Sequence, residues 1–275
     1  MHKCRLQGGE IVTGAALVKG INRLIKIKVD PHTHTIASGH AFSTVQENAF
    51  HAGEMGLEAI AMTDHFGPMF WGSDGPRFGT DINMQALPKV IYGVRILAGT
   101  EICIVDFDGN LAGQDIYDKL SGKKSLCDFL LDSREVTIAS LHYFEGMENG
   151  TAEQFTDMYC NVAKNSKVDI IGHCGRMNFP FDIKKVLLTA KENNTCIEIN
   201  SSTLYRKDAQ PKCEKIARYC KELEVPIVVG SDAHSSFYVG EFGNALTMLE
   251  RIDFPEELVI NSSAEKFFKF FGIER

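Results

Sequence analysis

Two histidines stand two positions apart in the stretch 29-VDPHTHT-35, which follows a run of apolar and basic residues. In a strand, side chains at positions i and i+2 project from the same face, roughly 6–7 Å apart along the chain. His32 and His34 can therefore bind one object at the strand end, and neutral imidazole is a common ligand of transition metals. The pair alone leaves open a metal site or an incidental pair of histidines, because short motifs often occur without function.

Residues of the same chemical kind follow the other apolar, β-rich segments of the chain. Six of the nine histidines stand at such segment ends, a seventh follows the first segment closely, and only His2 and His51 are left over. Because the carboxyl ends of the strands open on one face of a βα barrel, these side chains are expected to converge on a multinuclear metal site. The residues concerned are His32, His34, His40, Asp64, His65, Glu101, His142, His173, Asp232 and His234.

The segments that must position these residues alternate between two patterns. Short apolar runs of β-forming residues are separated by stretches with apolar residues at helical spacing, and this alternation predicts a parallel sheet. Seven strands, with no G-x-G-x-x-G after the first, favour a barrel over a doubly wound sheet. The expected strands are 25–34, 58–65, 94–104, 136–144, 168–175, 196–202 and 226–234, and the expected helices are 43–56, 152–165, 182–194, 210–224 and 241–252.

Two local signals and one boundary complete this α/β assignment. Ser43 followed by Gln46 predicts a capping box at the start of the first helix. The closing segment 263-SAEKFFKFFG-272 carries four phenylalanines and is expected to dock on the barrel wall. Residues 25–275 form one predicted barrel domain, and residues 1–24 stand outside the repeat as an N-terminal extension of unknown role.

The overall composition excludes several classes of protein. The formal net charge of -7 argues against a nucleic-acid partner and leaves a small-molecule substrate. No apolar run reaches the roughly 20 residues that a membrane helix needs. The segment 11-IVTGAALV-18 is short and is followed by basic residues, so it is a poor signal peptide and a cytoplasmic protein is expected. Eight cysteines without a C-x-x-C pair predict reduced, structural thiols, and the oligomeric state is not readable.

The chain contains an ordered series of short motifs: D-P-H-T-H-T with a following His40, then T-D-H, G-T-E, S-L-H, I-G-H and G-S-D-A-H. This series resembles that of the PHP (polymerase and histidinol phosphatase) family, with the YcdX-like phosphatases as the most similar branch. The resemblance runs from about Lys28 to the C-terminus. It implies a distorted seven-stranded (β/α)7 barrel of TIM-like form that carries three divalent metal ions. Zinc is expected first, with iron and manganese as alternatives.

Carried over motif by motif, the resemblance also implies how the ligands are shared. It assigns one ion to His32, His34, Glu101 and Asp232, a second to Glu101, His142 and His173, and a third to His40, His65 and His234. All nine positions hold the expected residue type. The departures are the extra N-terminal residues and Cys174 beside His173.

The expected reaction is hydrolysis of phosphomonoesters by a hydroxide that bridges two metal ions, since coordination lowers the pKa of water toward neutrality. The cations also stabilise the charge that develops on the phosphoryl oxygens. Glu101 and Asp232 are expected at the catalytic centre. Asp64 is expected either to orient an imidazole or assist proton transfer, or simply to cap a turn. Arg176 and Arg206 are candidates for binding the phosphate of a small phosphorylated substrate.

Three alternatives need separate treatment. The run 102-ICIVDFDGNL-111 resembles the nucleophile motif of aspartyl-phosphate phosphatases, but Asp108-Gly109 favours a hairpin turn instead. A metal-dependent amidohydrolase also begins with H-x-H, although such enzymes typically bridge their metals with a modified lysine. A metal-binding barrel without catalysis is the third alternative.

The loop 66-FGPMFWGSDGPRFG-79 directly follows His65 and carries the only tryptophan of the chain. Its length and position make it a candidate lid over the metal ions. The alternative is a rigid loop in which Trp71 packs against the barrel.

Overall fold

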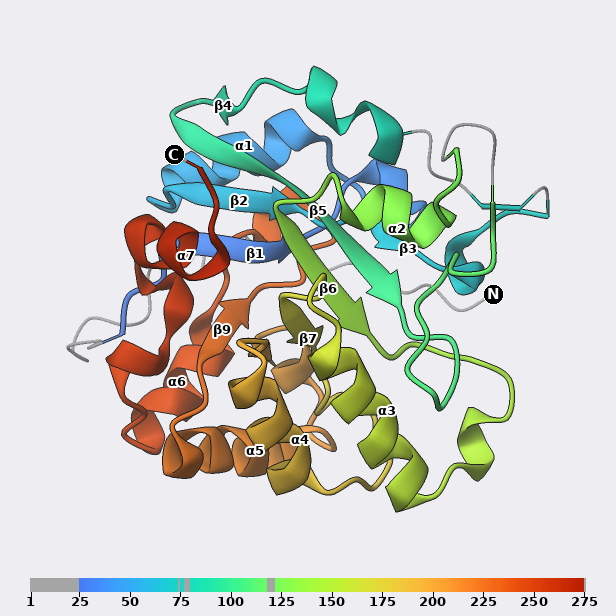
Figure 1. Ribbon diagram of the computed structural model, residues 1–275. Helices are drawn as coiled ribbons and strands as arrows, with labels where there is room; N and C mark the ends of the chain where they lie inside the picture. The colour runs from blue at the N-terminus through green and yellow to red at the C-terminus, as the bar shows by residue number, and fades with distance from the viewer. Residues whose placement is uncertain (1–24, 74, 77–79, 118–121, 275) are drawn as a thin grey trace, which may run out of the picture.

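The computed structural model describes residues 25–73, 75–76, 80–117 and 122–274 (Figure 1). The predicted extension 1–24 lies outside the described residues. Within the described part, seven parallel strands form the body of a nearly closed barrel, which confirms the predicted fold. Their order around the barrel is β1 (Val29–Thr33), β2 (Ala59–Met62), β5 (Val94–Cys103), β6 (Val136–Ser140), β7 (Ile170–Gly172), β8 (Cys196–Asn200) and β9 (Ile227–Gly230).

Two short strands extend this sheet. β3 (His65–Phe66) continues the course of β2 and pairs in parallel with the carboxyl half of β5, where His65 lies opposite Glu101. β4 (Val90–Ile91) pairs antiparallel with the start of β5. The long β5 therefore holds the second strand segment at the end of the barrel where the ligand-type residues gather.

Most of the helices cover the outside of the barrel (Figure 1). Their inward faces pack on the outward-facing residues of the strands in one large apolar core. No helix in the described ranges is long and apolar enough to cross a membrane. The helices are α1 (Val45–Glu54), α2 (Leu126–Leu131), α3 (Ala152–Lys164), α4 (Ile183–Glu192), α5 (Gln210–Leu223), α6 (Gly243–Arg251) and α7 (Ala264–Phe271).

The first helix begins one residue later than its predicted capping box. Thr44 is the N-cap, and its side chain and that of Glu47 form the reciprocal bonds of the box. Ser43 is not available for this role, because its hydroxyl accepts a hydrogen bond from the backbone N–H of Ser236 (2.7 Å). A contact across 193 residues of sequence therefore decides where the helix begins.

The barrel closes between β1 and β9 by two different devices. At the carboxyl end the backbones bond directly, through Asp232 N–H to His32 O and His34 N–H to Ala233 O (2.9 Å each). Deeper in the barrel, the buried side chain of Asn261 bridges the two strands. Its amide donates to the carbonyl oxygens of Val29 (2.8 Å) and Val229 (2.7 Å), and its oxygen accepts from Val229 N–H (3.0 Å).

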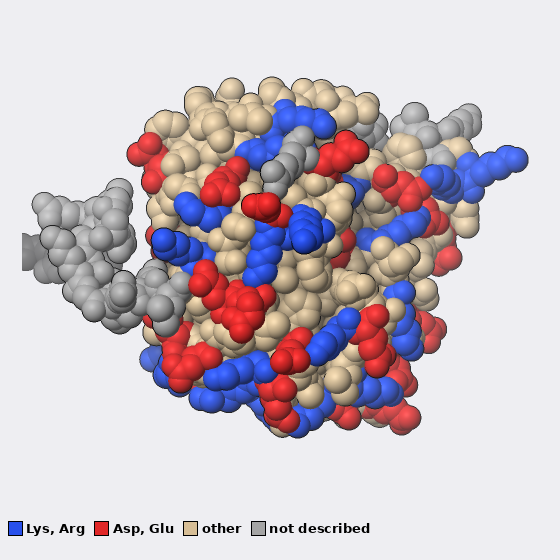
Figure 2. Space-filling model, turned by 60° about the vertical axis from the view of Figure 1, so that its left-hand side comes forward, with Lys and Arg blue, Asp and Glu red and all other residues tan. Residues whose placement is uncertain are grey.

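Helix α7 closes the amino-terminal end of the barrel. Phe267 and Phe268 pack with inward-facing strand residues such as Val29, Ala59 and Ile138. The expectation that this segment docks on the barrel wall was therefore wrong, because its phenylalanines pack with the interior residues of the strands and not with those that face the helices. On the face shown in Figure 2, acidic and basic side chains are interspersed.

Candidate metal centre

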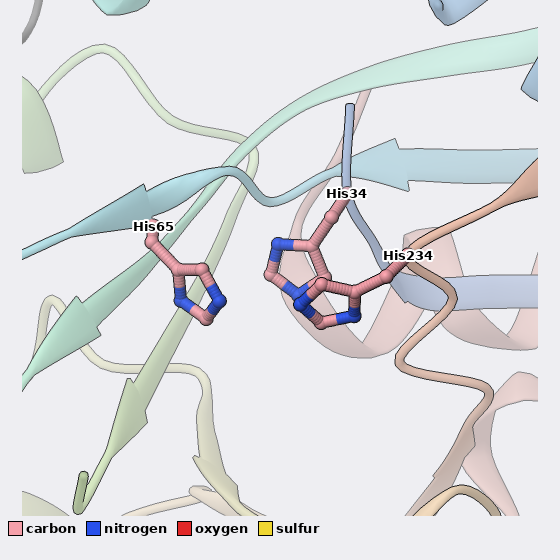
Figure 3. A group of neighbouring side chains, drawn as sticks. All are labelled: His34, His65 and His234. Atoms are coloured by element: carbon pink, nitrogen blue, oxygen red, sulfur yellow. The ribbon is translucent and has the colours of Figure 1, made fainter. Parts of the chain in front are cut away.

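The ligand-type residues predicted at the strand ends meet at the carboxyl end of the barrel. His32, His34 and Glu101 are fully buried, whereas His40 is exposed on the loop after β1. Figure 3 shows how His34, His65 and His234 point toward one another from three separate segments, the ends of β1 and β9 and strand β3. The parallel sheet thus brings together residues that are up to 202 positions apart in the sequence (32 to 234).

The first group consists of His32, His34, Glu101 and Asp232, whose ligand-type atoms all lie within 4.8 Å of one another. His34 Nε2 lies 3.1 Å from Asp232 Oδ1 and 3.4 Å from Glu101 Oε2, and His32 Nε2 lies 3.3 Å from Glu101 Oε2. Asp232 turns toward the group through a left-handed backbone conformation (φ 57°). Burial alone would raise the pKa of Asp232, but the nearby His32 and Arg176 hold it well below its usual range.

Glu101 lies at the centre of the whole arrangement. Its Oε1 is 2.8 Å from His173 Nε2 and 3.5 Å from His142 Nε2, and its Oε2 is 2.7 Å from His65 Nδ1. Burial alone would raise the pKa of this carboxyl, but the surrounding imidazoles, with His32 foremost, hold it well below its usual range. Together with the contacts of the first group, one carboxylate faces five imidazole rings.

The third predicted group, His40, His65 and His234, is also brought together. His40 Nε2 and His234 Nε2 lie 2.9 Å apart, and the His40 ring is stacked on the His65 ring with 4.9 Å between centroids. The geometry adds His34, whose ring nitrogen lies within 4.8 Å of those of His65 and His234. The first and third groups therefore share an edge, which the motifs alone do not indicate.

Hydrogen bonds to Nδ1 orient four of the histidines in the same way. Each Nδ1 meets a carboxylate, a carbonyl oxygen or a hydroxyl whose own proton is donated elsewhere, so Nδ1 carries a proton and Nε2 is the nitrogen that faces the centre. Ser38 illustrates this, since its hydroxyl donates to Asp64 Oδ1 (2.6 Å). Nδ1 of His32 contacts Glu198 Oε1 (2.7 Å), and Nδ1 of His34 contacts Ser38 Oγ (3.1 Å). Nδ1 of His40 contacts the carbonyl oxygen of Ser38 (3.2 Å), and Nδ1 of His234 contacts the carbonyl oxygen of Asp232 (3.0 Å).

Several polar atoms of the centre face one another inside the protein without a hydrogen bond. Four buried atoms of the centre have no hydrogen-bond partner among the described residues: His32 Nε2, His65 Nδ1, Glu101 Oε2 and His142 Nε2. Buried acceptors without a donor are costly, and a bound cation removes that cost. A set of imidazole nitrogens and carboxylate oxygens suits zinc, iron or manganese. The residues present therefore fit a cluster of divalent cations.

Asp64 contacts the turn after β1 and not an imidazole. It accepts hydrogen bonds from the backbone N–H and the hydroxyl of Thr35 (2.7 Å each) and from the hydroxyl of Ser38 (2.6 Å). Because Ser38 also contacts His34 Nδ1, Asp64 affects the centre through the turn that carries Ser38. This geometry favours the turn-capping alternative.

The two predicted phosphate-binding arginines differ in position. The guanidinium of Arg176 pairs with Asp232 Oδ2 at the edge of the centre, and it also donates to Thr203 Oγ1 (3.0 Å) and Asn200 Oδ1 (3.3 Å). Arg206 is exposed and bonds to Asp208 two residues along the chain (3.2 Å). Of the two, only Arg176 contacts a residue of the centre among the described contacts.

The segment around Asp106 forms the predicted hairpin. Ile104 pairs antiparallel with Leu111, and Gly109 occupies the left-handed region (φ 79°) that the turn requires. Asp106 accepts hydrogen bonds from the backbone N–H (3.0 Å) and the side-chain amide (2.8 Å) of Asn110. Asp106 is thus a turn residue, which rules out the aspartyl-phosphate alternative.

The candidate lid is packed in its described part, and residues 74 and 77–79 of it lie outside the described residues. The Phe70 ring lies parallel to the His65 ring at 3.9 Å between centroids, and Trp71 packs on the buried Phe66 at 5.3 Å. These contacts favour a rigid loop at Trp71. Sequence reasoning missed Phe70, although it follows His65 by five positions on the loop already singled out.

Glu198 was also missed. It lies inside β8, and its carboxylate contacts His32 Nδ1 (2.7 Å) and the backbone N–H of His173 (2.8 Å). The signal was present as an acidic residue within the otherwise apolar run 196-CIEI-199.

The chain matches known proteins over most of its length. The family model of the PHP domain matches residues 30–202, and that of the PHP-associated region matches residues 210–262. A probable phosphatase of Acetivibrio thermocellus is 44% identical over 88% of this chain and 94% of its own length. A probable phosphatase of Caldanaerobacter subterraneus subsp. tengcongensis is 43% identical over 88% and 90%, respectively.

Among solved structures, the histidinol phosphate phosphatase of Lactococcus lactis, complexed with zinc, L-histidinol and phosphate, has a similar fold. It covers 83% of this chain and 94% of its own with a TM-score of 0.56 and 20% identity. A histidinol phosphatase structure from Listeria monocytogenes gives a TM-score of 0.51 at 19% identity, over 80% and 99% of the two chains.

Proposed function

The chain belongs to the PHP family, and on this premise we propose that it is a metal-dependent phosphatase that hydrolyses small phosphomonoesters. The observation that carries the proposal is the set of buried, partnerless lone pairs at the carboxyl end of the barrel. Divalent cations satisfy all of them at once.

We assign three ions to the centre, with zinc as the first choice and iron or manganese as alternatives. His32, His34, Glu101 and Asp232 would hold one ion, Glu101, His142 and His173 would hold a second, and His40, His65 and His234 would hold the third. Glu101 would serve both of the first two ions, since its two oxygens face different imidazoles.

The bound cations supply Lewis acidity and activate water at neutral pH. The chain's own residues do the rest. Buried Nδ1 contacts hold the imidazoles so that the lone pairs stay aimed at one place without reorganisation. Arg176 adds a fixed positive charge beside Asp232, in reach of an anionic group that enters the centre. Phe70 covers His65 and excludes water from that side.

A small substrate fits the net charge of the chain better than a nucleic acid does. The net charge of the chain is -7, and Arg176 is the one guanidinium that the described contacts place against a residue of the centre. A nucleic-acid footprint would require a basic surface. The substrate is therefore a small phosphorylated molecule whose phosphate provides most of its charge.

The test is to load purified protein with zinc or manganese and to measure phosphate release from a panel of phosphomonoesters, with a phosphodiester, an amide and a lactone in parallel. Monoesters should be hydrolysed fastest. Glu101→Gln should abolish turnover because it weakens a bridge shared by two ions, whereas Asp106→Asn, a turn variant, should retain it. Preferred cleavage of the amide or the lactone would replace the proposal with an amidohydrolase or a lactonase. Metal binding without any turnover would indicate a non-catalytic barrel.

A further inference from the structure

An acidic side chain inside the barrel is not explained by the ligand set. Glu198 lies in the middle of β8 and is 3% exposed. On the same inward face, Cys196 packs with apolar residues of the barrel interior, whereas Ile197 and Ile199 face the helices. A carboxylate at such a position is costly unless it is fully hydrogen-bonded. Its partners therefore indicate what it does.

Two of the three hydrogen bonds that the Glu198 side chain accepts in the described contacts come from proposed metal ligands. Oε1 accepts from His32 Nδ1 (2.7 Å) and from the side-chain amide of Asn200 (3.2 Å). Oε2 accepts from the backbone N–H of His173 (2.8 Å). One carboxylate thus reaches two proposed ligands, one on β1 and one directly after β7.

The two contacts act on different parts of those ligands. At His32 the carboxylate fixes the proton on Nδ1, which leaves the Nε2 lone pair 3.3 Å from Glu101 Oε2. At His173 it holds a backbone in the left-handed region (φ 25°), which costs energy for a residue other than glycine. That conformation places His173 Nε2 2.8 Å from Glu101 Oε1. Each oxygen of the bridging Glu101 therefore faces a ring that Glu198 positions.

The neighbouring strand is adapted to this carboxylate. Gly230 lies at the end of β9, beside β8. A Cβ at position 230 would overlap Glu198 Oε1 and would lie 3.0 Å from His32 Cβ. Glycine is required here for the space that Glu198 occupies, since the positive-φ residues of the described chain do not include Gly230.

We propose that Glu198 is a positioning residue that couples the two metal positions sharing Glu101. This inference rests on the metal centre of the proposed function. Loss of the carboxylate loosens both ions together, because His32 belongs to one position and His173 to the other. Loss of a single ligand such as His142 loosens one ion only.

The direct test is Glu198→Gln, with zinc affinity measured by competition with a chromogenic chelator. Glutamine has the same shape, but one of its two head atoms is a donor, so it cannot accept from both His32 Nδ1–H and His173 N–H. We expect two of the three zinc equivalents to bind about 10- to 100-fold more weakly, the usual effect of losing such a partner. His142→Ala should weaken one equivalent. Glu135→Gln, the same substitution at the amino-terminal end of the barrel, should weaken none.

A second readout separates positioning from a general effect on the fold. In zinc-loaded protein, the ring nitrogen chemical shifts of His32 should show a protonated Nδ1 and a coordinated Nε2, and Glu198→Gln should abolish this pattern. Gly230→Ala keeps the negative charge but displaces the carboxylate, so it should reproduce the loss of two equivalents even if Glu198→Gln does not fold.

Wild-type zinc affinity in a folded Glu198→Gln or Gly230→Ala protein would overturn the proposal, and so would a loss confined to one ion. These measurements do not depend on turnover. Wild-type protein that binds zinc but releases no phosphate would refute the proposed function and leave the role of Glu198 standing.

Discussion

Asp64 either caps the turn after β1 or takes part in proton transfer, and the variant Asp64→Asn distinguishes these two roles. The asparagine oxygen can keep the two bonds that Oδ1 accepts, from Thr35 N–H (2.7 Å) and Ser38 Oγ–H (2.6 Å). Its amide replaces Oδ2, so the Thr35 hydroxyl must turn from donor to acceptor. The three bonds survive but lose the assistance of the negative charge. A bond to a charged group contributes roughly 1 kcal/mol more than a neutral one, so the free energy of unfolding should fall by about 3 kcal/mol.

Asp64→Ala should cost more, because it removes all three acceptors at a residue that is 8% exposed. Three buried donors without partners correspond to about 4 kcal/mol in the free energy of unfolding. Both variants can be compared by urea denaturation of the metal-free proteins. Asp106→Asn, which alters a hairpin turn away from the centre, is the matched control and should change stability by less than about 1 kcal/mol.

The catalytic readout decides between the two roles. If Asp64 only holds the turn that carries Ser38, Asp64→Asn should keep its bound zinc and a kcat within about threefold of wild type. A group that transfers a proton in the rate-limiting step contributes roughly 10²–10⁴-fold. A folded, fully zinc-loaded Asp64→Asn protein whose kcat is reduced a hundredfold would refute the turn-capping role.

Three further predictions follow from single contacts. His40→Ala should lower bound zinc by about one equivalent without unfolding the protein, since His40 is exposed and its Nε2 meets only His234 in the described contacts. Unchanged metal content by elemental analysis would remove His40 from the ligand set. Asn261→Ala should lower the free energy of unfolding, measured by urea denaturation, by about 3 kcal/mol, because three backbone groups at the β1–β9 closure lose their partner. A loss below about 1 kcal/mol would show that this closure does not need the Asn261 side chain. Burial raises the pKa of Asp169 from 3.8 to about 6, so the stability associated with its neutral form is present at pH 4 and is lost as pH rises through 6. Asp169→Asn should therefore gain about 2 kcal/mol over wild type between pH 4 and pH 7, and a pH-independent difference would contradict the raised pKa.

The arrangement of the ligand-type residues was predictable from sequence because it depends on one rule. Parallel strands place their carboxyl ends on one face, so His32, Glu101, His173 and Asp232 meet once the strands are recognised. The rule does not give the division of ligands. His34 lies within reach of His65 and His234 as well as of its predicted group, and the spacing of the motifs does not show this.

The parts that were missed depend on contacts between distant segments. An acidic residue inside a strand does not show that Gly230 leaves room for it or that the His173 backbone needs its support. In the same way, Ser43 has the residue type of a helix cap, but Ser236 uses its hydroxyl. The local sequence predicts that a helix cap or a supporting side chain is needed, and the tertiary structure decides which residue provides it.

The most direct test of the metal centre is a titration of verified metal-free protein with zinc, with the initial rate of phosphate release recorded at each step. The centre consists of nine strand-end and loop residues that enclose partnerless lone pairs. We therefore expect no turnover without metal. The rate should rise as the ions bind and level off near three equivalents. Full phosphatase activity at zero zinc would contradict the account.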